Sequence, residues 1–185
     1  MTKNKEGSFR IIAIVFFVTM LIAFNWEKWD WLRKIIHTIL DPTLGGLLNW
    51  NLTIGMIIIT LILSVITTVL QKYTTNQKEL RKIKKLQKEL QDKSKENRND
   101  PKKSMEIQKE MMELMPKQMK LGMRTIVYTG IPFVLLFRWF YDFFDILEVS
   151  TGAPVRFFGF LSWFWFYLIF TMVFSSILKK KFDVV

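Results

Sequence analysis

Four long apolar stretches alternate with polar segments along the chain, at residues 9–26, 52–70, 125–141 and 157–178. Each approaches the roughly 20 residues that a helix needs to cross a hydrocarbon layer about 30 Å thick. A backbone without water around it can satisfy its hydrogen bonds only as a helix, so we predict four membrane-spanning helices. Pro132 and Arg138 interrupt the third of them.

The first apolar stretch has a basic start, which is also typical of a cleaved signal peptide. No cleavage site with small residues follows it, because the apolar run ends at Asn25, Trp26 and Glu27. We therefore expect residues 1–26 to remain as an N-terminal tail and signal-anchor helix.

The charges between the spans predict the orientation of the chain. Residues 71–124 contain 16 basic and 8 acidic residues, a net charge of +8, whereas 142–156 has a net charge of −2 and 27–51 is neutral. Basic loops remain on the cytosolic side of a membrane. We therefore predict a multi-pass protein of the cell membrane, with both termini and the 71–124 segment in the cytosol.

The segment between the first two spans has apolar residues at intervals of three and four, with charged residues between them. This periodicity predicts a short amphipathic helix within residues 27–51. Trp26 and Trp29 suit the headgroup layer, so we expect the helix to lie flat on the outer face. His37 is interpreted as a residue of its polar face.

Residues 71–123 are predicted to form a lysine-rich helical hairpin. Residues 97–99 fit the turn, and Asp100 followed by Pro101 fits the start of the second arm. We expect the arms to pack as an antiparallel coiled coil along one narrow seam, with Pro116 as a kink. A narrow seam buries little surface, so the hairpin should be mobile. The seam is assigned to Tyr73, Leu80, Ile83, Leu86 and Leu90 on the first arm and to Met105, Ile107, Met111, Met112, Leu114, Met115 and Met119 on the second.

The second arm contains a stretch of 19 residues, from Met105 to Met123, that holds six of the ten methionines. Methionine is flexible and polarizable, so a methionine-rich face adapts to many apolar partners. The same residues could instead fill the seam, and both interpretations stay open. The candidates for contact with a client polypeptide are Met111, Met112, Met115, Met119 and Met123.

The lysines of the hairpin allow three interpretations. They could contact the phosphates of ribosomal RNA or the headgroups of anionic lipids. They could equally form a solvated face that only fixes the orientation of the chain in the membrane.

Polar residues in the second span fall on one face. They are Thr60, Ser64, Thr67, Thr68 and Gln71, at helical spacing. Polar groups in a membrane usually face a watery cavity or the interior of the bundle, so this stripe could line a hydrophilic groove. Small hydroxyl residues also allow close packing of helices, which is the alternative.

Arg138 is the one charge well inside a predicted span. A charge in this position normally has a partner or a water-filled site. An ion pair with Asp142, one helical turn further on, is one expectation, and a place on the groove wall is another.

The composition argues against catalytic chemistry. The chain has no cysteine and a single histidine, His37. A disulfide, a thiolate metal site and a cysteine nucleophile are therefore excluded. We expect no metal and no cofactor, and we do not expect an enzyme.

Residues from about 50 to 181 resemble the archaeal YidC-like proteins of the YidC/Oxa/Alb superfamily, which is related to insertase subunits of the endoplasmic reticulum. The order and spacing of several short segments carry the resemblance. These segments are residues 67–72, 119–123, 130–132, 138–139 and 161–167.

The resemblance implies an all-α membrane protein with a three-helix core at 52–70, 124–141 and 157–178. The 71–123 hairpin would lie between the first two core helices, with 142–156 as an outer loop and 179–185 as a cytosolic tail. The core would enclose a hydrophilic groove open to the cytosol. The candidate groove residues are Thr60, Ser64, Thr67, Thr68, Gln71, Arg124 and Arg138.

Bacterial relatives carry an arginine on the first core helix, and this chain has none between Leu52 and Leu70. The resemblance nevertheless implies a membrane-protein insertase or chaperone that helps nascent membrane proteins enter the bilayer. Its partners would be nascent clients, membrane lipids and, as a further candidate, the ribosome, with no small-molecule substrate and no DNA. The alternatives are an ion-conducting or leak protein and a structural scaffold that binds a cytosolic partner through the hairpin.

Overall fold

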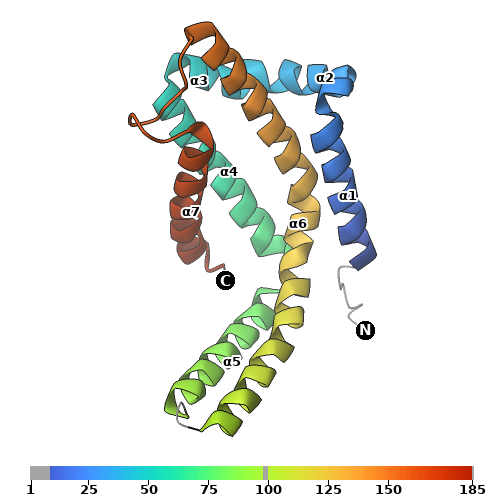
Figure 1. Ribbon diagram of the computed structural model, residues 1–185, viewed down its shortest axis with the longest axis vertical. Helices are drawn as coiled ribbons and strands as arrows, with labels where there is room; N and C mark the ends of the chain where they lie inside the picture. The colour runs from blue at the N-terminus through green and yellow to red at the C-terminus, as the bar shows by residue number, and fades with distance from the viewer. Residues whose placement is uncertain (1–8, 98–99, 185) are drawn as a thin grey trace.

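The computed structural model describes residues 9–97 and 100–184 (Figure 1). These residues form helices and connecting turns and contain no β-strand, which confirms the predicted all-α class. Two helical stretches, Arg10–Lys28 and Leu52–Thr74, are long and apolar enough to cross a membrane. The two later spans stay predictions.

The N-terminal part of the chain forms a long helix and a crossing helix. Helix α1 (Phe9–Asn25) leads through a short 3-10 turn into α2 (Asp30–Leu40), which lies across one end of the bundle (Figure 1). A π-turn at Asp41–Gly45 and the short helix α3 (Gly46–Trp50) follow. The amphipathic helix that the sequence predicts within 27–51 is therefore α2, and we call this end of the molecule the α2 end.

Helices α4 (Leu52–Thr74) and α5 (Gln77–Glu96) are each started by an asparagine. The side chain of Asn51 accepts a hydrogen bond from the Ile54 amide at 3.0 Å, and that of Asn76 accepts one from the Glu79 amide at 3.2 Å. Both are N-cap bonds that satisfy an otherwise unpaired backbone donor. Helix α4 runs four residues beyond the predicted span.

Helix α6 (Pro101–Thr151) is a single helix of 51 residues. Asp100 accepts hydrogen bonds from the amides of Lys102 and Lys103, with Pro101 in the first turn, which confirms the predicted start. The helix continues through Pro116 and through the expected boundary at 123/124. Pro116 and Pro132 both lie inside the helix, where each removes one backbone donor and crowds the carbonyl four residues earlier, and the helix continues past both.

Helix α7 (Trp163–Phe182) begins six residues later than the predicted span, so that start was wrong. Residues 157–161 form a tight turn instead, in which the Phe157 amide donates to the Leu161 carbonyl at 2.7 Å and the Leu161 amide donates back at 3.0 Å. Gly159 adopts a φ of +84°, which costs glycine little.

The core lies near the α2 end, where α3, α4, α6 and α7 meet. Its fully buried aromatic members are Trp139, Phe140, Phe144, Phe157 and Phe166. Phe144 stacks on Trp163 with ring centroids 5.5 Å apart. Helix α4 packs chiefly along α7, and α1 packs along the second half of α6. Helix α5 packs along the first half of α6, and we call these two segments the hairpin (Figure 1).

Glycine allows one close approach beside this core. A Cβ atom at Gly55 would lie 2.4 Å from the carbonyl oxygen of Leu47. That separation is far below a van der Waals contact, so only glycine lets α3 fold back against the start of α4.

Candidate functional site

A cavity of about 550 Å³ lies between α2, α4 and α6, and we call it the α4–α6 cavity. Its lining is almost entirely apolar. The lining residues are Ile36, Ile39, Leu40, Thr43, Leu44, Ile62, Leu63, Ile66, Thr67, Leu70, Tyr128, Thr129, Ile131, Pro132, Phe133, Leu135 and Leu136. An apolar cavity of this size between helices is a typical place for an apolar guest.

The two ends of the α4–α6 cavity are bounded differently. Apolar residues of α2 cover one end. One turn beyond the other end, Thr125 of α6 shares hydrogen bonds of 3.0 Å with the hydroxyls of Thr74 and Thr75. These bonds hold the last turn of α4 against α6.

The predicted polar stripe on α4 is divided by the fold. Thr60, Ser64 and Thr68 are buried, with exposed fractions of 0%, 0% and 1%. The hydroxyls of Thr60 and Thr68 donate to carbonyls of their own helix, and that of Ser64 has no hydrogen-bond partner among the described residues. This placement favours helix packing for these three residues.

The other two members of the stripe have different positions. Thr67 lines the α4–α6 cavity, and its hydroxyl donates to the Leu63 carbonyl at 2.9 Å. Gln71 is partly exposed, and its carbonyl accepts a hydrogen bond of 2.9 Å from the Gln77 side chain. Thr67 is thus the one residue of the stripe that lines the cavity.

The structure describes the side chain of one of the two predicted groove cations, Arg138. The side chain of Arg124 lies outside the described part of the structure. Arg138 does not line the cavity, and its guanidinium carbon lies 5.9 Å from the ring of Trp26 and 5.4 Å from that of Tyr141. No ion pair joins Arg138 to Asp142 within the described ranges, so that expectation was wrong.

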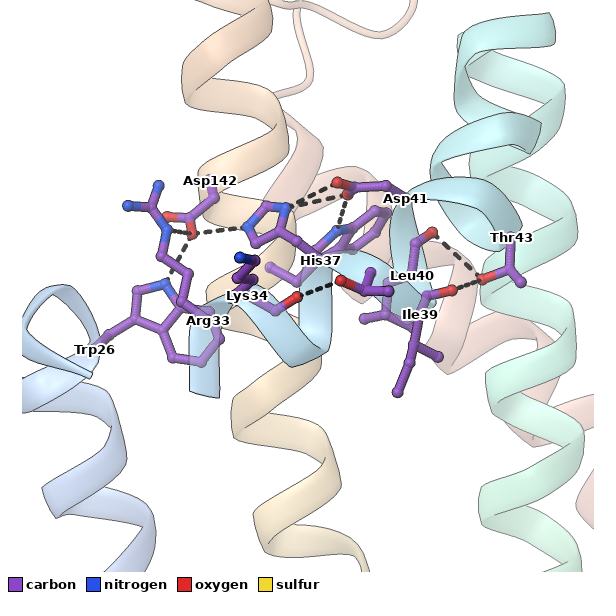
Figure 2. Close-up of polar contacts among 11 residues, drawn as sticks. Trp26, Arg33, Lys34, His37, Ile39, Leu40, Asp41, Thr43 and Asp142 are labelled. Carbon is purple, nitrogen blue, oxygen red and sulfur yellow. Dashed lines mark hydrogen bonds and ion pairs between the residues drawn. The ribbon is translucent and has the colours of Figure 1, made fainter. Parts of the chain in front are cut away.

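Asp142 is engaged by three other residues, which explains the missing ion pair (Figure 2). Its Oδ2 atom accepts hydrogen bonds from Trp26 Nε1 and Arg33 Nε, each at 2.8 Å, and lies 3.2 Å from His37 Nε2. The Asp142 side chain is only 8% exposed. These contacts tie the end of α1 and the middle of α2 to α6.

A second carboxylate extends this arrangement. Asp41 lies 3.1 Å from His37 Nδ1 and accepts a 2.7 Å hydrogen bond from Trp139 Nε1 (Figure 2). We call the set Trp26, Arg33, His37, Asp41, Trp139 and Asp142 the α2 network. Sequence reasoning placed His37 on a polar face and missed this role. The four-residue spacing of His37 and Asp41 was the available signal.

The hairpin seam uses other residues than expected. Four predicted seam residues, Met105, Met112, Met115 and Met119, are each more than half exposed, and we call them the methionine face. On α5 the buried side is Leu80, Ile83 and Leu90. On α6 the partly buried residues at seam spacing are Ile107, Met111, Leu114, Gln118 and Leu121.

A polar contact crosses the seam, because Gln87 Nε2 donates to Gln118 Oε1 at 2.7 Å. Met111 and Met123 are partly buried, whereas the methionine face is open. The two interpretations of the methionines therefore apply to different residues: Met111 belongs to the seam, and the methionine face is free to contact a partner.

Comparison with known proteins gives one match. The model of a family described as integral membrane protein EMC3/TMCO1-like matches residues 37–184, a range that begins inside α2 and ends beyond α7. No curated protein and no solved structure matched. This family belongs to the Oxa1/YidC/Alb3 insertase superfamily, which confirms the resemblance at the level of the superfamily. The chain therefore belongs to the EMC3/TMCO1-like family of integral membrane proteins, which is associated with membrane-protein insertion.

Proposed function

We propose that this protein is an insertase-type chaperone with no enzymatic activity. The methionine face receives an apolar segment of a nascent membrane protein, and that segment then moves along α6 to the α4–α6 cavity and into lipid. The hairpin lies in the cytosol in this scheme, and the bundle spans the cell membrane.

The observation that carries this proposal is the continuity of α6. One unbroken helix bears both the methionine face and a wall of the cavity. Met119 and Tyr128 are nine residues apart, which is roughly 14 Å along a helix. Nine residues are about two and a half helical turns, so a client segment would move along α6 and round to its other face to pass from one surface to the other.

The methionine face is an exposed apolar surface beside a charged face of the same helix, so an apolar guest would bind to the methionines. Glu106, Glu110, Glu113 and Lys117 form another exposed face of the same helix. Flexible methionine side chains can adapt to client segments of different shape, whereas a charged face would reject them.

The α4–α6 cavity suits the next step because its lining offers an apolar environment beside the bilayer. Its few polar groups include Thr67, Tyr128 and Thr129, all near the hairpin end. These hydroxyls would form hydrogen bonds with the polar flank of a client at the point of entry. The groove is thus mainly apolar in this proposal, with polar groups at one end, and Arg124 remains a candidate for the charge near that end.

The lysines of the hairpin would serve this function through charge. The hairpin and its flanks carry a net charge of +8, which would attract the ribosome or anionic lipid headgroups. Client proteins and lipids are the expected partners.

Site-specific photo-crosslinking tests the proposal. A crosslinker at Met115 and another at Ile66 should capture ribosome-bound membrane-protein clients, because Met115 lies on the methionine face and Ile66 on the cavity wall. Lys117 on the charged face and Val173 on the exposed side of α7 are the matched controls.

Strong adducts at the first pair and weak ones at the controls would support the insertase. Equal capture at all four positions would overturn the route along α6. Capture at Met115 alone, by an isolated hairpin as well as by the full chain, would instead indicate the scaffold function.

A further inference from the structure

Arg138, at the α2 end, is a cation that has no anionic partner among the described residues. Its Nε atom is buried and has no hydrogen-bond partner among the described residues. Its guanidinium lies between the fully buried ring of Trp26 and the half-exposed ring of Tyr141. The charged group therefore lies at the edge of the protein, between the end of α1 and the side of α6.

The nearest carboxylate in sequence cannot neutralise it. Asp142 lies one turn further along α6, but its Oδ2 atom already accepts from Trp26 and Arg33 and lies beside His37. Arg33 uses only its Nε atom there, and its side chain is 40% exposed. Asp142 is thus occupied by Arg33, and the charge of Arg138 beside Trp26 is left without a carboxylate partner among the described residues.

The position of this charge indicates its ligand. Tyr141 is half exposed and is a residue of the kind that gathers at the headgroup layer of a membrane, and α2 with its exposed Trp31 and Ile35 lies across the bundle at the same end. A buried charge beside a membrane is costly unless it is paired. The guanidinium fork matches phosphate geometry, and phosphate is the anion that a headgroup layer supplies.

We propose that the α2 end holds the headgroup of an anionic phospholipid, whose phosphate accepts hydrogen bonds from Arg138 and from the terminal nitrogens of Arg33. The lipid fastens the end of α1 and α2 to the leaflet at this end of the bundle. Trp26 and Arg33 precede the range that the family model matches, so this site uses residues of the N-terminal helices of this chain. It is separate from the α4–α6 cavity and from the methionine face, and it does not depend on the proposed function.

Lipid titration of the purified full chain in detergent tests this site. Phosphatidylglycerol, phosphatidylcholine and inorganic phosphate are each added, and bound lipid is counted by native mass spectrometry while the melting temperature is followed. Phosphatidylglycerol should bind and raise the melting temperature of the natural chain, whereas phosphatidylcholine and inorganic phosphate should do so far less. An equal effect of inorganic phosphate would identify a free-anion site and overturn the lipid proposal.

Two variants separate the site from general surface charge. Arg138→Gln should weaken phosphatidylglycerol binding about tenfold or more, the loss expected for a charge-assisted hydrogen bond. Arg156→Gln removes the same charge from an exposed position in the loop before α7 and should leave binding unchanged. Equal binding by all three proteins, or equal losses in both variants, would overturn the proposal.

Arg138→Lys keeps the test decisive if the glutamine variant does not fold. Lysine keeps the charge but lacks the planar fork, so phosphatidylglycerol binding should fall between the other two values. Full binding by the lysine variant would show that charge alone attracts the lipid and would overturn the role of the guanidinium.

Discussion

The α2 end and the hairpin end of the molecule hold the same helix, α6, by different means. At the α2 end, Trp139, Phe140 and Phe144 are fully buried among α3, α4 and α7, and Asp142 accepts hydrogen bonds from two other elements. At the hairpin end, α6 shares one seam with α5, and the methionine face is open.

This difference follows from how much surface each end buries. A fully buried aromatic side chain makes many contacts, and these contacts favour one packing arrangement of the helices around it. A two-helix seam leaves most of each helix in solvent, so its position is weakly fixed. The α2 end should therefore be the more rigid part of the molecule, and the hairpin end the more adaptable one.

The largest effect should come from Trp139→Ala at the α2 end. The change removes a fully buried side chain and its hydrogen bond to Asp41, so the free energy of unfolding should fall by about 3–5 kcal/mol. Denaturant unfolding in detergent measures this. Met119→Ala on the methionine face should change it by less than about 0.5 kcal/mol, and similar losses in both variants would remove the contrast between the ends.

Asp142→Asn tests the polar part of the same end. The neutral amide is a weaker acceptor and brings an NH₂ group close to donors of Trp26 and Arg33, so stability should fall by about 1–3 kcal/mol. Asp145→Asn, at an exposed position on the same helix, is the matched control. The melting temperature of each variant in detergent checks the prediction, which fails if Asp142→Asn melts like its control.

The double substitution Gln87→Leu and Gln118→Leu should make the hairpin seam more apolar and more stable, and so closer in these properties to the core at the α2 end. It replaces a polar contact in the seam by an apolar one, which should stabilise the hairpin by about 1 kcal/mol. Amide hydrogen exchange should slow in α5 and in the first half of α6, and stay the same in α7. Faster exchange in the hairpin would mean that the two glutamines stabilise the seam more than leucines do.

The smallest effect is expected where the hairpin meets α7. Arg81 of α5 donates to the Asp183 carbonyl at 2.7 Å and pairs with its carboxylate, and both side chains are largely exposed. Arg81→Gln should therefore cost only about 0.2–1 kcal/mol while broadening the spin-label distance between α5 and α7. Lys84→Gln, on the same helix, should leave that distance distribution unchanged. An unchanged distribution in Arg81→Gln would show that the seam alone positions the hairpin.

The sequence alone determined the helical class, the start of α6 and the amphipathic character of α2. These features depend on local signals, such as the Asp100 cap before Pro101 and the periodic apolar residues of 27–51. Interactions between residues close together in the sequence are enough to produce them. The length of α6 was missed because changes of composition near residues 123 and 142 were taken as element boundaries, although one helix runs through both. The start of α7 was missed because the apolar residues 157–162 resemble a span in composition.

Only the tertiary structure decided which face of each helix is covered. Periodicity places Met111 and Met112 on neighbouring faces, but the position of α5 makes one a seam residue and leaves the other exposed. Likewise, Asp142 receives its partners Trp26 and Arg33 from more than a hundred residues away, and α4 turns Thr60 and Ser64 into the interior. Local propensity fixes a helix and its faces, whereas the surface that a helix buries depends on where its distant neighbours pack.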